Sequence, residues 1–426
     1  MGCTAAAKGG WPPGPLTCRG GIAKQSRVTS EERTKRSYER RPYPTTNIAG
    51  LVEKGGSLPP LKWMQAVGRP GRSAPQRVLV AGCGTGVEAF VMRRRLPTAE
   101  IVAVDFSPRS IVWAQRLERA TDGVRPITFR VGDLTDRKIA DVVGGDFDLI
   151  TCHGVLSYLP KPSVVLENVA SCLRAGGALY LGVNGEAHPA TRLRPWLASF
   201  GLAVDELREE RRLRELLGLW DALNDDGSGE LATMSSSYLG GDVCGPHFNN
   251  WSLARWRSEA NHSGWEVAGT DVLPMALHLA AERKNDRVLY PAGVGELAAR
   301  LDQARPAGFH RIMLRRATTG ALDVTRAGEG ARPLQWTGLY SVRFSQSGAR
   351  RTVKAIFNCA AFHVRFEHEL TAGQQRALRA LMAAGFAPDG WTKQWNRTAE
   401  GRRLLWLWAG LGVVAVGDAA GAGVLG

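Results

Sequence analysis

A short glycine-rich segment carries the clearest chemical signal in this chain. Gly82-Cys83-Gly84-Thr85-Gly86 follows the apolar run Val78–Ala81 and precedes a helical pattern that begins at Val87. Glycines let the backbone turn sharply here and approach a ligand closely, because a Cβ would collide with it. A strand before the loop and a helix after it are the setting of a nucleotide-binding loop.

Two carboxylates follow at the ends of the next two predicted strands. Asp105 ends the run Ile-Val-Ala-Val-Asp and is placed to accept hydrogen bonds from both hydroxyls of a ribose. Asp133 follows in Val-Gly-Asp-Leu, where its carboxylate is placed to hold an adenine amino group. A dinucleotide loop would need GxGxxG, with a third glycine where Val87 stands. The GxGxG spacing therefore favours a different adenosine-containing cofactor.

Strand and helix patterns alternate around these residues. We expect helices over 61–67, 87–96, 110–120 and 163–173, and strands over 77–81, 101–105, 127–131, 147–151, 177–183, 265–272 and 309–315. Such alternation predicts an α/β fold, with a parallel sheet covered by helices on both faces. Ligands of such sheets bind at the carboxyl ends of the strands, which is where the loop and both carboxylates fall.

Across roughly residues 75–185 the sequence resembles the class I methyltransferases that use S-adenosylmethionine. The matching segments fall in family order: Val78 to Gly86, the Asp105 strand, Gly132-Asp-Leu, Phe147-Asp-Leu-Ile and Leu173-Arg-Ala-Gly-Gly-Ala-Leu-Tyr. The resemblance implies a Rossmann-like sheet of seven strands and an enzyme that binds S-adenosylmethionine. The implied cofactor residues are Gly82, Cys83, Gly84, Thr85, Gly86, Asp105, Phe106, Asp133, Leu134 and His153. One position departs from the family, which commonly has an acid where this chain has Val80.

A finer similarity involves segments outside the cofactor loop. The segments Tyr38–Pro44 and Cys152–Pro160, with the spacing of Phe248–Trp256 and Gly264-Trp265, resemble bacterial methyltransferases that carry a methyltransferase regulatory domain. That group includes lysine methyltransferases of outer-membrane proteins. The methyl acceptor stays open between a small molecule and a protein, because the similarity does not extend clearly to the C-terminal domain.

Methyl transfer requires mainly alignment of donor and acceptor, together with a base where the acceptor must lose a proton. His153 and Tyr158, in the loop after the fourth strand, are the candidate bases, ahead of His188 and His247. The acceptor is expected to be an N or O nucleophile. Two alternatives remain open: a weakly catalytic, cofactor-binding regulatory protein, and an RNA methyltransferase.

Three further segments surround this predicted domain of residues 46–317. Residues 1–45 are predicted to be a disordered basic tail, and residues 186–250 an inserted cap or a packing helix. Residues 318–426 are predicted to form a smaller α+β domain with a regulatory or accessory role. It would contain strands over 339–344, 352–357 and 361–366, a helix over 372–384, and a buried hairpin over 404–416. Its tryptophans, Trp391, Trp395, Trp406 and Trp408, are expected in its core.

Charge and cysteine usage narrow the partners. The net charge is +15; residues 1–41 carry nine Lys or Arg against three Glu, and residues 318–426 carry thirteen against seven acids. The basic ends permit nucleic acid as a partner without favouring it. The seven cysteines include no CxxC pair, which favours a reducing, cytoplasmic setting without a structural metal. The apolar run 404–416 is too short to cross a membrane.

Overall fold

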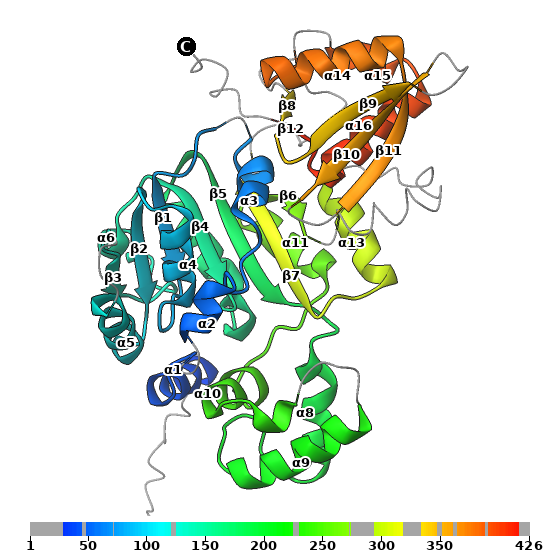
Figure 1. Cartoon of the computed structure of the whole chain (residues 1–426). Helices are drawn as coiled ribbons and strands as arrows, with labels where there is room; N and C mark the ends of the chain where they lie inside the picture. Colours follow the sequence, from blue (N-terminus) through cyan, green and yellow to red (C-terminus); the bar gives the residue numbers. More distant parts are fainter. Residues whose placement is uncertain are drawn as a thin grey trace, which may run out of the picture.

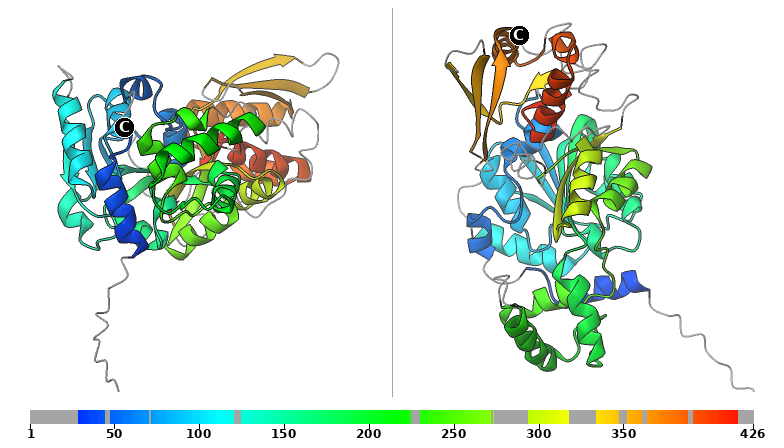
Figure 2. Two further views of the ribbon diagram at one scale, coloured as in Figure 1. Left: turned by 90° about the horizontal axis from the view of Figure 1, so that it is seen from below. Right: turned by 90° about the vertical axis from the view of Figure 1, so that its right-hand side faces the viewer.

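The computed structural model divides into a central α/β domain, a helical cap and a C-terminal domain. It describes residues 29–44, 48–70, 72–120, 125–224, 230–271, 273, 294–317, 334–346, 352–360, 364–387 and 391–416. Figure 1 shows the cap and the C-terminal domain at opposite ends of the central sheet, and the right-hand view of Figure 2 shows the same separation.

The central sheet has seven strands in the order β3-β2-β1-β4-β5-β7-β6. The strands are β1 Arg77–Ala81, β2 Glu100–Asp105, β3 Thr128–Val131, β4 Phe147–His153, β5 Leu173–Asn184, β6 Trp265–Thr270 and β7 Phe309–Arg316. Neighbours from β3 to β5 are parallel, and β7 is antiparallel to both β5 and β6. The predicted Rossmann-like, seven-stranded sheet is confirmed, with a reversed strand that the alternation pattern alone did not indicate.

Helices cover both faces of this sheet, so its inner strands are apolar almost throughout. The helices are α2 Ile48–Glu53, α3 Leu61–Gly68, α4 Val87–Arg95, α5 Pro108–Arg119, α6 Ile139–Val143, α7 Pro162–Ala170, α11 Leu253–His262 and α13 Val294–Ala304. Two buried tryptophans join helices to strands: Trp256 of α11 bonds to the end of β5, and Trp265 of β6 bonds to α7. Trp256 Nε1 donates to the Asn184 carbonyl at 2.9 Å, and Trp265 Nε1 donates to the Leu166 carbonyl at 3.0 Å.

The described parts of residues 186–250, which are 186–224 and 230–250, form a cap with a hydrophobic core of its own. It contains α8 Pro189–Ser199, α9 Glu210–Leu223, η2 Leu231–Thr233, α10 Ser236–Tyr238 and η3 Leu239–Val243. Leucines of these elements, among them Leu193, Leu213 and Leu239, pack together in a cluster separate from the core of the sheet. The cap lies beyond the carboxyl ends of the parallel strands (Figure 1). It therefore covers the end of the sheet at which ligands bind in such folds.

The prediction of a disordered tail is wrong for residues 30–40. Ser30–Arg40 forms helix α1, which begins at the N-cap Thr29. The Thr29 side chain accepts from the Glu32 backbone amide while the Glu32 side chain accepts from the Thr29 amide. This reciprocal capping box, Thr-x-x-Glu, is a local signal for the start of a helix. The prediction of disorder used only the basic composition of the segment and did not consider this signal. Residues 1–28 and residue 45 of the predicted tail lie outside the described residues.

The C-terminal domain combines a three-stranded antiparallel sheet with three helices. The sheet has the order β11-β10-β9, formed by Val364–Thr371, Thr352–Cys359 and Ser341–Gln346; β8 Leu334–Trp336 pairs with β12 Val414–Val416. The helices are α14 Ala372–Ala384, α15 Trp391–Asn396 and α16 Ala399–Leu411. Three of the predicted core tryptophans, Trp391, Trp395 and Trp408, are buried; the side chain of Trp406 lies outside the described part.

The predicted hairpin over residues 404–416 is wrong. The segment is the second half of α16 followed by the short strand β12, with Gly412 ending the helix in the left-handed conformation at φ 74°. A short apolar run is compatible with a hairpin or with a helix. Here the helix starts before the run, at Ala399, and its leucines pack in the core. Across the described residues, no helix has the length and apolar character needed to cross a bilayer.

Candidate functional site

A pocket of about 330 Å³ lies between the carboxyl ends of the central strands, helix α1 and the cap. This volume is within the usual range of small-molecule sites, roughly 300–1,000 Å³. Nine of the eleven predicted site residues line it: Gly82, Cys83, Gly84, Asp105, Phe106, Asp133, Leu134, His153 and Tyr158. All lining residues precede residue 310, so the C-terminal domain contributes no side chain to the pocket.

The glycine loop has the sharp turns that its sequence predicts. Gly82, Gly84 and Gly86 have φ values of 74°, 52° and 99°, a region that favours glycine. A Cβ on Gly84 would lie 2.3 Å from the Tyr43 carbonyl oxygen, so the approach of the N-terminal segment also requires a glycine there.

Thr85 and Gly86 do not line the pocket. Thr85 is fully buried, its amide donates to the Tyr43 carbonyl at 3.1 Å and its hydroxyl donates to the Pro44 carbonyl. Gly86 is the N-cap of α4. These two residues thus hold the loop in place rather than facing a ligand.

Asp105 is buried at the end of β2 and supports the glycine loop. Its Oδ2 accepts from the Gly84 amide at 2.9 Å, and its Oδ1 accepts from the Ser107 amide at 2.9 Å. Burial raises the pKa of Asp105 to about 6, against the two amide hydrogen bonds. Each oxygen retains a lone pair, so the carboxylate still has acceptor capacity for ribose hydroxyls.

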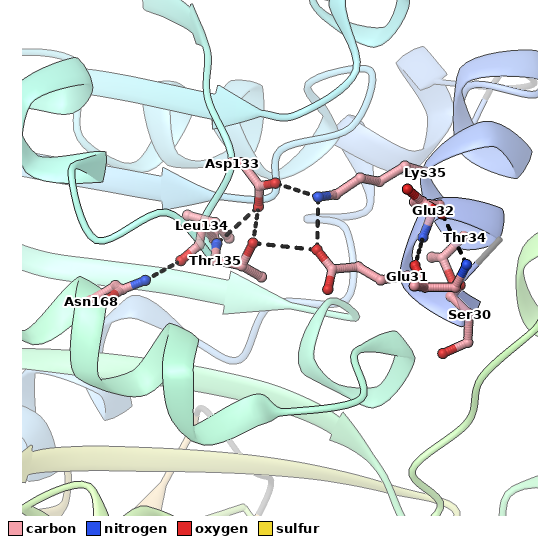
Figure 3. Close-up of polar contacts among 10 residues, drawn as sticks. Ser30, Glu31, Glu32, Thr34, Lys35, Asp133, Leu134, Thr135 and Asn168 are labelled. Atoms are coloured by element: carbon pink, nitrogen blue, oxygen red, sulfur yellow. Dashed lines mark hydrogen bonds and ion pairs between the residues drawn. The ribbon is translucent and has the colours of Figure 1, made fainter. Parts of the chain in front are cut away.

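Asp133, at the end of β3, is engaged by helix α1 (Figure 3). Lys35 Nζ lies 2.5 Å from Asp133 Oδ2 and 2.8 Å from Glu31 Oε1, while Thr135 donates to Asp133 Oδ1 from its amide and its hydroxyl. Burial alone would raise the pKa of Asp133, but the hydrogen bonds from Lys35 and Thr135 outweigh it and lower that pKa. The predicted adenine contact therefore shares its carboxylate with a lysine that the sequence patterns did not single out.

Both candidate bases line the pocket, but their surroundings oppose that role. His153 Nδ1 lies 2.8 Å from Tyr180 Oη, and burial, with a smaller effect of Arg311, lowers the pKa of His153 to about 3. Its imidazole is therefore a weak base. Burial and the nearby Asp242 raise the pKa of Tyr158 well above its ordinary value, so the phenol stays protonated.

Asp242 gives the pocket a second acidic centre, on the cap side. The Tyr158 hydroxyl donates to Asp242 Oδ1, and Tyr43 also hydrogen-bonds to this carboxylate. Burial raises the pKa of Asp242, while the two phenols oppose the shift. Tyr38 and Tyr238 line the same part of the pocket, and Tyr38 meets Tyr158 edge to face with ring centroids 6.4 Å apart. We call Tyr38, Tyr43, Tyr158, Tyr238 and Asp242 the tyrosine chamber.

The sequence patterns missed most residues of the chamber because they come from distant segments. Tyr38 belongs to α1, Tyr43 to the segment after it, and Tyr238 and Asp242 to the cap. Of the two less favoured candidate bases, His188 lines the pocket and is the N-cap of α8. His247 is not among the lining residues; its Nε2 lies 2.9 Å from Asn249 Oδ1. No group of acidic, histidine or cysteine side chains in the described ranges has the arrangement of a metal site.

The part of the chain that contains the glycine loop is similar to known proteins. Residues 79–179 match a family model described as a methyltransferase domain. The chain is 33% identical over 153 residues to an uncharacterised protein of Synechococcus sp., covering 36% of each. It is 35% identical over 108 residues to a ubiquinone biosynthesis O-methyltransferase of Xanthomonas axonopodis pv. citri, covering 25% of this chain and 43% of that protein.

A solved structure of PKMT2 from Rickettsia typhi in complex with AdoHcy is similar at 15% identity and a TM-score of 0.47, covering 75% of this chain and 65% of that one. The chain spans only about two fifths of the length of the curated relatives it matches. The segment matched by the family model contains the glycine loop, Asp105 and Asp133.

Proposed function

We propose that this chain, which carries a class I methyltransferase domain, binds S-adenosylmethionine and transfers its methyl group to a nitrogen or oxygen nucleophile of a protein or small molecule. One observation carries the proposal: a single pocket joins the glycine loop and the carboxylates of Asp105 and Asp133 to the tyrosine chamber. In this proposal the glycine loop, Asp105 and Asp133 bind the methyl donor, and the tyrosine chamber binds the methyl acceptor.

The residues present fit the cofactor. The glycine loop exposes backbone at the end of β1, Asp105 retains acceptor capacity for ribose hydroxyls, and Phe106 and Leu134 supply apolar surface for adenine. Asp133 is placed to accept from the adenine amino group on Oδ2, which accepts only from Lys35, because Oδ1 already accepts from the Thr135 amide and hydroxyl. When bound, the cofactor supplies an already activated methyl group on its sulfonium. The protein then has to align the acceptor and exclude water.

The tyrosine chamber favours a nitrogen acceptor that arrives as a cation. Tyrosine ring faces attract ammonium groups, and Asp242 adds a negative charge among them. An ammonium group must lose a proton before its nitrogen can attack a methyl group. Asp242 is placed to take that proton, because its raised pKa makes it a better acceptor than an ordinary aspartate.

The test is to incubate the purified full chain with methyl-labelled S-adenosylmethionine and a fractionated cell lysate. We expect label in a protein or small-molecule fraction, and we expect it to survive mild alkali, as N-methyl groups do. Label released as methanol would indicate a carboxylate oxygen acceptor, and label in RNA would overturn the assignment of acceptor class. The Asp105→Ala variant should lose the transfer, while Glu167→Gln, an exposed carboxylate on α7, should not.

If labelling by Asp105→Ala equals that of the unaltered protein, the proposed donor site is wrong. If the unaltered protein labels nothing and produces no S-adenosylhomocysteine in any fraction, the proposed enzymatic activity is wrong.

A further inference from the structure

Glu88 is a pocket carboxylate with no partner among the described side chains. It lies in the first turn of α4, directly after the glycine loop, and its side chain lines the pocket. In the described part of the chain it forms no ion pair, and no side chain or backbone group of another residue hydrogen-bonds to it. Burial consequently raises the pKa of Glu88 to about 7.

The other carboxylates of the pocket are all engaged. Asp105 accepts from two backbone amides, Asp133 from Lys35 and Thr135, and Asp242 from two phenols. Glu31 pairs with Lys35. A desolvated carboxylate without such partners costs folding free energy. Glu88 therefore has the character of a group whose partner is a ligand rather than another part of the protein.

The place of Glu88 in the pocket indicates which part of the cofactor it meets. The predicted ribose and adenine contacts, Asp105 and Asp133, lie at the ends of β2 and β3, on one side of β1 in the sheet. Glu88 instead lies in the first turn of α4, two residues after Gly86, and the pocket wall near α4 includes Gly56. Glu88 thus lies beside the glycine loop and not at the ends of β2 and β3, so the amino-acid arm is the part of the cofactor left for it when ribose and adenine meet Asp105 and Asp133.

The end of β1 supplies no acid for that arm. Val80 is 2% exposed and packs in the core of the sheet. The amino-acid arm carries an α-ammonium group, which forms its strongest hydrogen bonds with a carboxylate. We propose that Glu88 binds the α-ammonium group of the methionine arm of S-adenosylmethionine and is the carboxylate that selects cofactors carrying that arm. This inference rests on the proposed function, since it concerns the same donor site.

Two thioether ligands that share the adenosine part can separate binding of the amino-acid arm by Glu88 from a general effect on cofactor binding. S-adenosylhomocysteine carries the amino-acid arm, whereas 5′-methylthioadenosine lacks it, and neither has a charged sulfur. Binding of both to the full-length protein would be measured by isothermal titration calorimetry at pH 8, where Glu88 is ionised. We expect Glu88→Gln to bind S-adenosylhomocysteine about tenfold to a hundredfold more weakly and 5′-methylthioadenosine unchanged.

Three further variants complete the experiment. Glu88→Asp keeps the charge on a shorter side chain and should lose less affinity than Glu88→Gln. Glu167→Gln is the matched control and should bind both ligands as the unaltered protein does. Asp105→Ala should weaken both ligands, because its contact is to the adenosine part. Circular dichroism establishes that each variant is folded.

The outcomes distinguish this inference from the proposed function. An unchanged affinity of Glu88→Gln for S-adenosylhomocysteine, or an equal loss for both ligands, overturns the role of Glu88 alone. An unaltered protein that binds neither ligand overturns the proposed donor site, and the role of Glu88 with it.

Discussion

Lys35 Nζ lies 2.5 Å from Asp133 Oδ2, so a helix of the N-terminal segment forms an ion pair with the carboxylate that follows β3 (Figure 3). The same helix is joined to the cap, because Arg33 Nη1 lies 2.7 Å from Asp205 Oδ2 and Arg40 Nη1 lies 3.0 Å from Glu206 Oε1. Helix α1 therefore bridges the sheet and the cap beside the pocket, with ion pairs to both.

Removing the charge of Lys35 should loosen α1. Both partners of the ion pair are about a third exposed, so its contribution is modest, about 0.5–1 kcal/mol. We expect Lys35→Met to increase the rate of chymotryptic cleavage after Tyr38 by roughly twofold to fivefold, because local opening becomes more frequent. Lys54→Met, which alters an exposed lysine after α2, is the control. Equal cleavage rates in all three proteins would show that the ion pair does not hold the helix.

Asp242→Asn should impair methyl transfer without impairing donor binding. The amide retains a hydrogen-bonding side chain for the neighbouring phenols but cannot take a proton from the acceptor. We expect kcat to fall about 100-fold or more, measured as S-adenosylhomocysteine formed with the acceptor fraction, with affinity for S-adenosylhomocysteine unchanged. Asp141→Asn, at an exposed position of α6, should leave both quantities unchanged. A kcat that survives in Asp242→Asn would remove Asp242 from the proton transfer.

Glu88 should make the stability of the ligand-free protein depend on pH. Its pKa in the folded state is raised by burial from 4.5 to about 7, so the folded protein binds more protons than the unfolded chain. The ionisation of Glu88 therefore lowers folding stability as pH rises from about 4.5 to about 7. Tyr43, Cys83 and Tyr180, on which its charge acts, have raised pKa values and stay neutral in this range.

Glu88→Gln removes this cost. We expect the variant to melt roughly 2 °C or more above the unaltered protein at pH 8, and the difference to be smaller at pH 5. Thermal unfolding followed by circular dichroism measures both values. A difference that is as large at pH 5 as at pH 8 would mean that the carboxylate charge is not the destabilising feature.

The C-terminal domain should be needed for stability rather than for cofactor binding. Phe357 is fully buried there and stacks on Phe366 with ring centroids 4.7 Å apart, within a hydrophobic core that is continuous with the central sheet. Phe357→Ala should lower the free energy of unfolding by about 3–5 kcal/mol, measured by urea denaturation. The affinity of the folded variant for S-adenosylhomocysteine should not change, because no C-terminal residue lines the pocket. A large loss of affinity would instead indicate coupling between the two ends of the sheet.

Local sequence was sufficient to predict the central domain and its glycine loop. Strand β1 and helix α14 have the bounds that their patterns predict, because alternating or periodic apolar residues and clear end signals specify such elements locally. The helix α16 was predicted wrongly, since a short apolar run with two glycines satisfies a hairpin equally well. The order of β6 and β7 also depends on packing between distant segments rather than on either segment alone.

The sequence by itself determined that Gly82, Gly84, Asp105 and Asp133 share one pocket, because they lie at or just after the ends of neighbouring parallel strands, and parallel strands end at one edge of a sheet. Only the tertiary structure decided which residues of α1 and the cap complete the pocket and which partners these residues have. Tyr38 and Asp242 are separated by about 200 residues, and their meeting depends on how α1 and the cap pack over that edge. The tertiary structure likewise showed that Lys35 engages Asp133 and that Glu88 has no partner among the described residues.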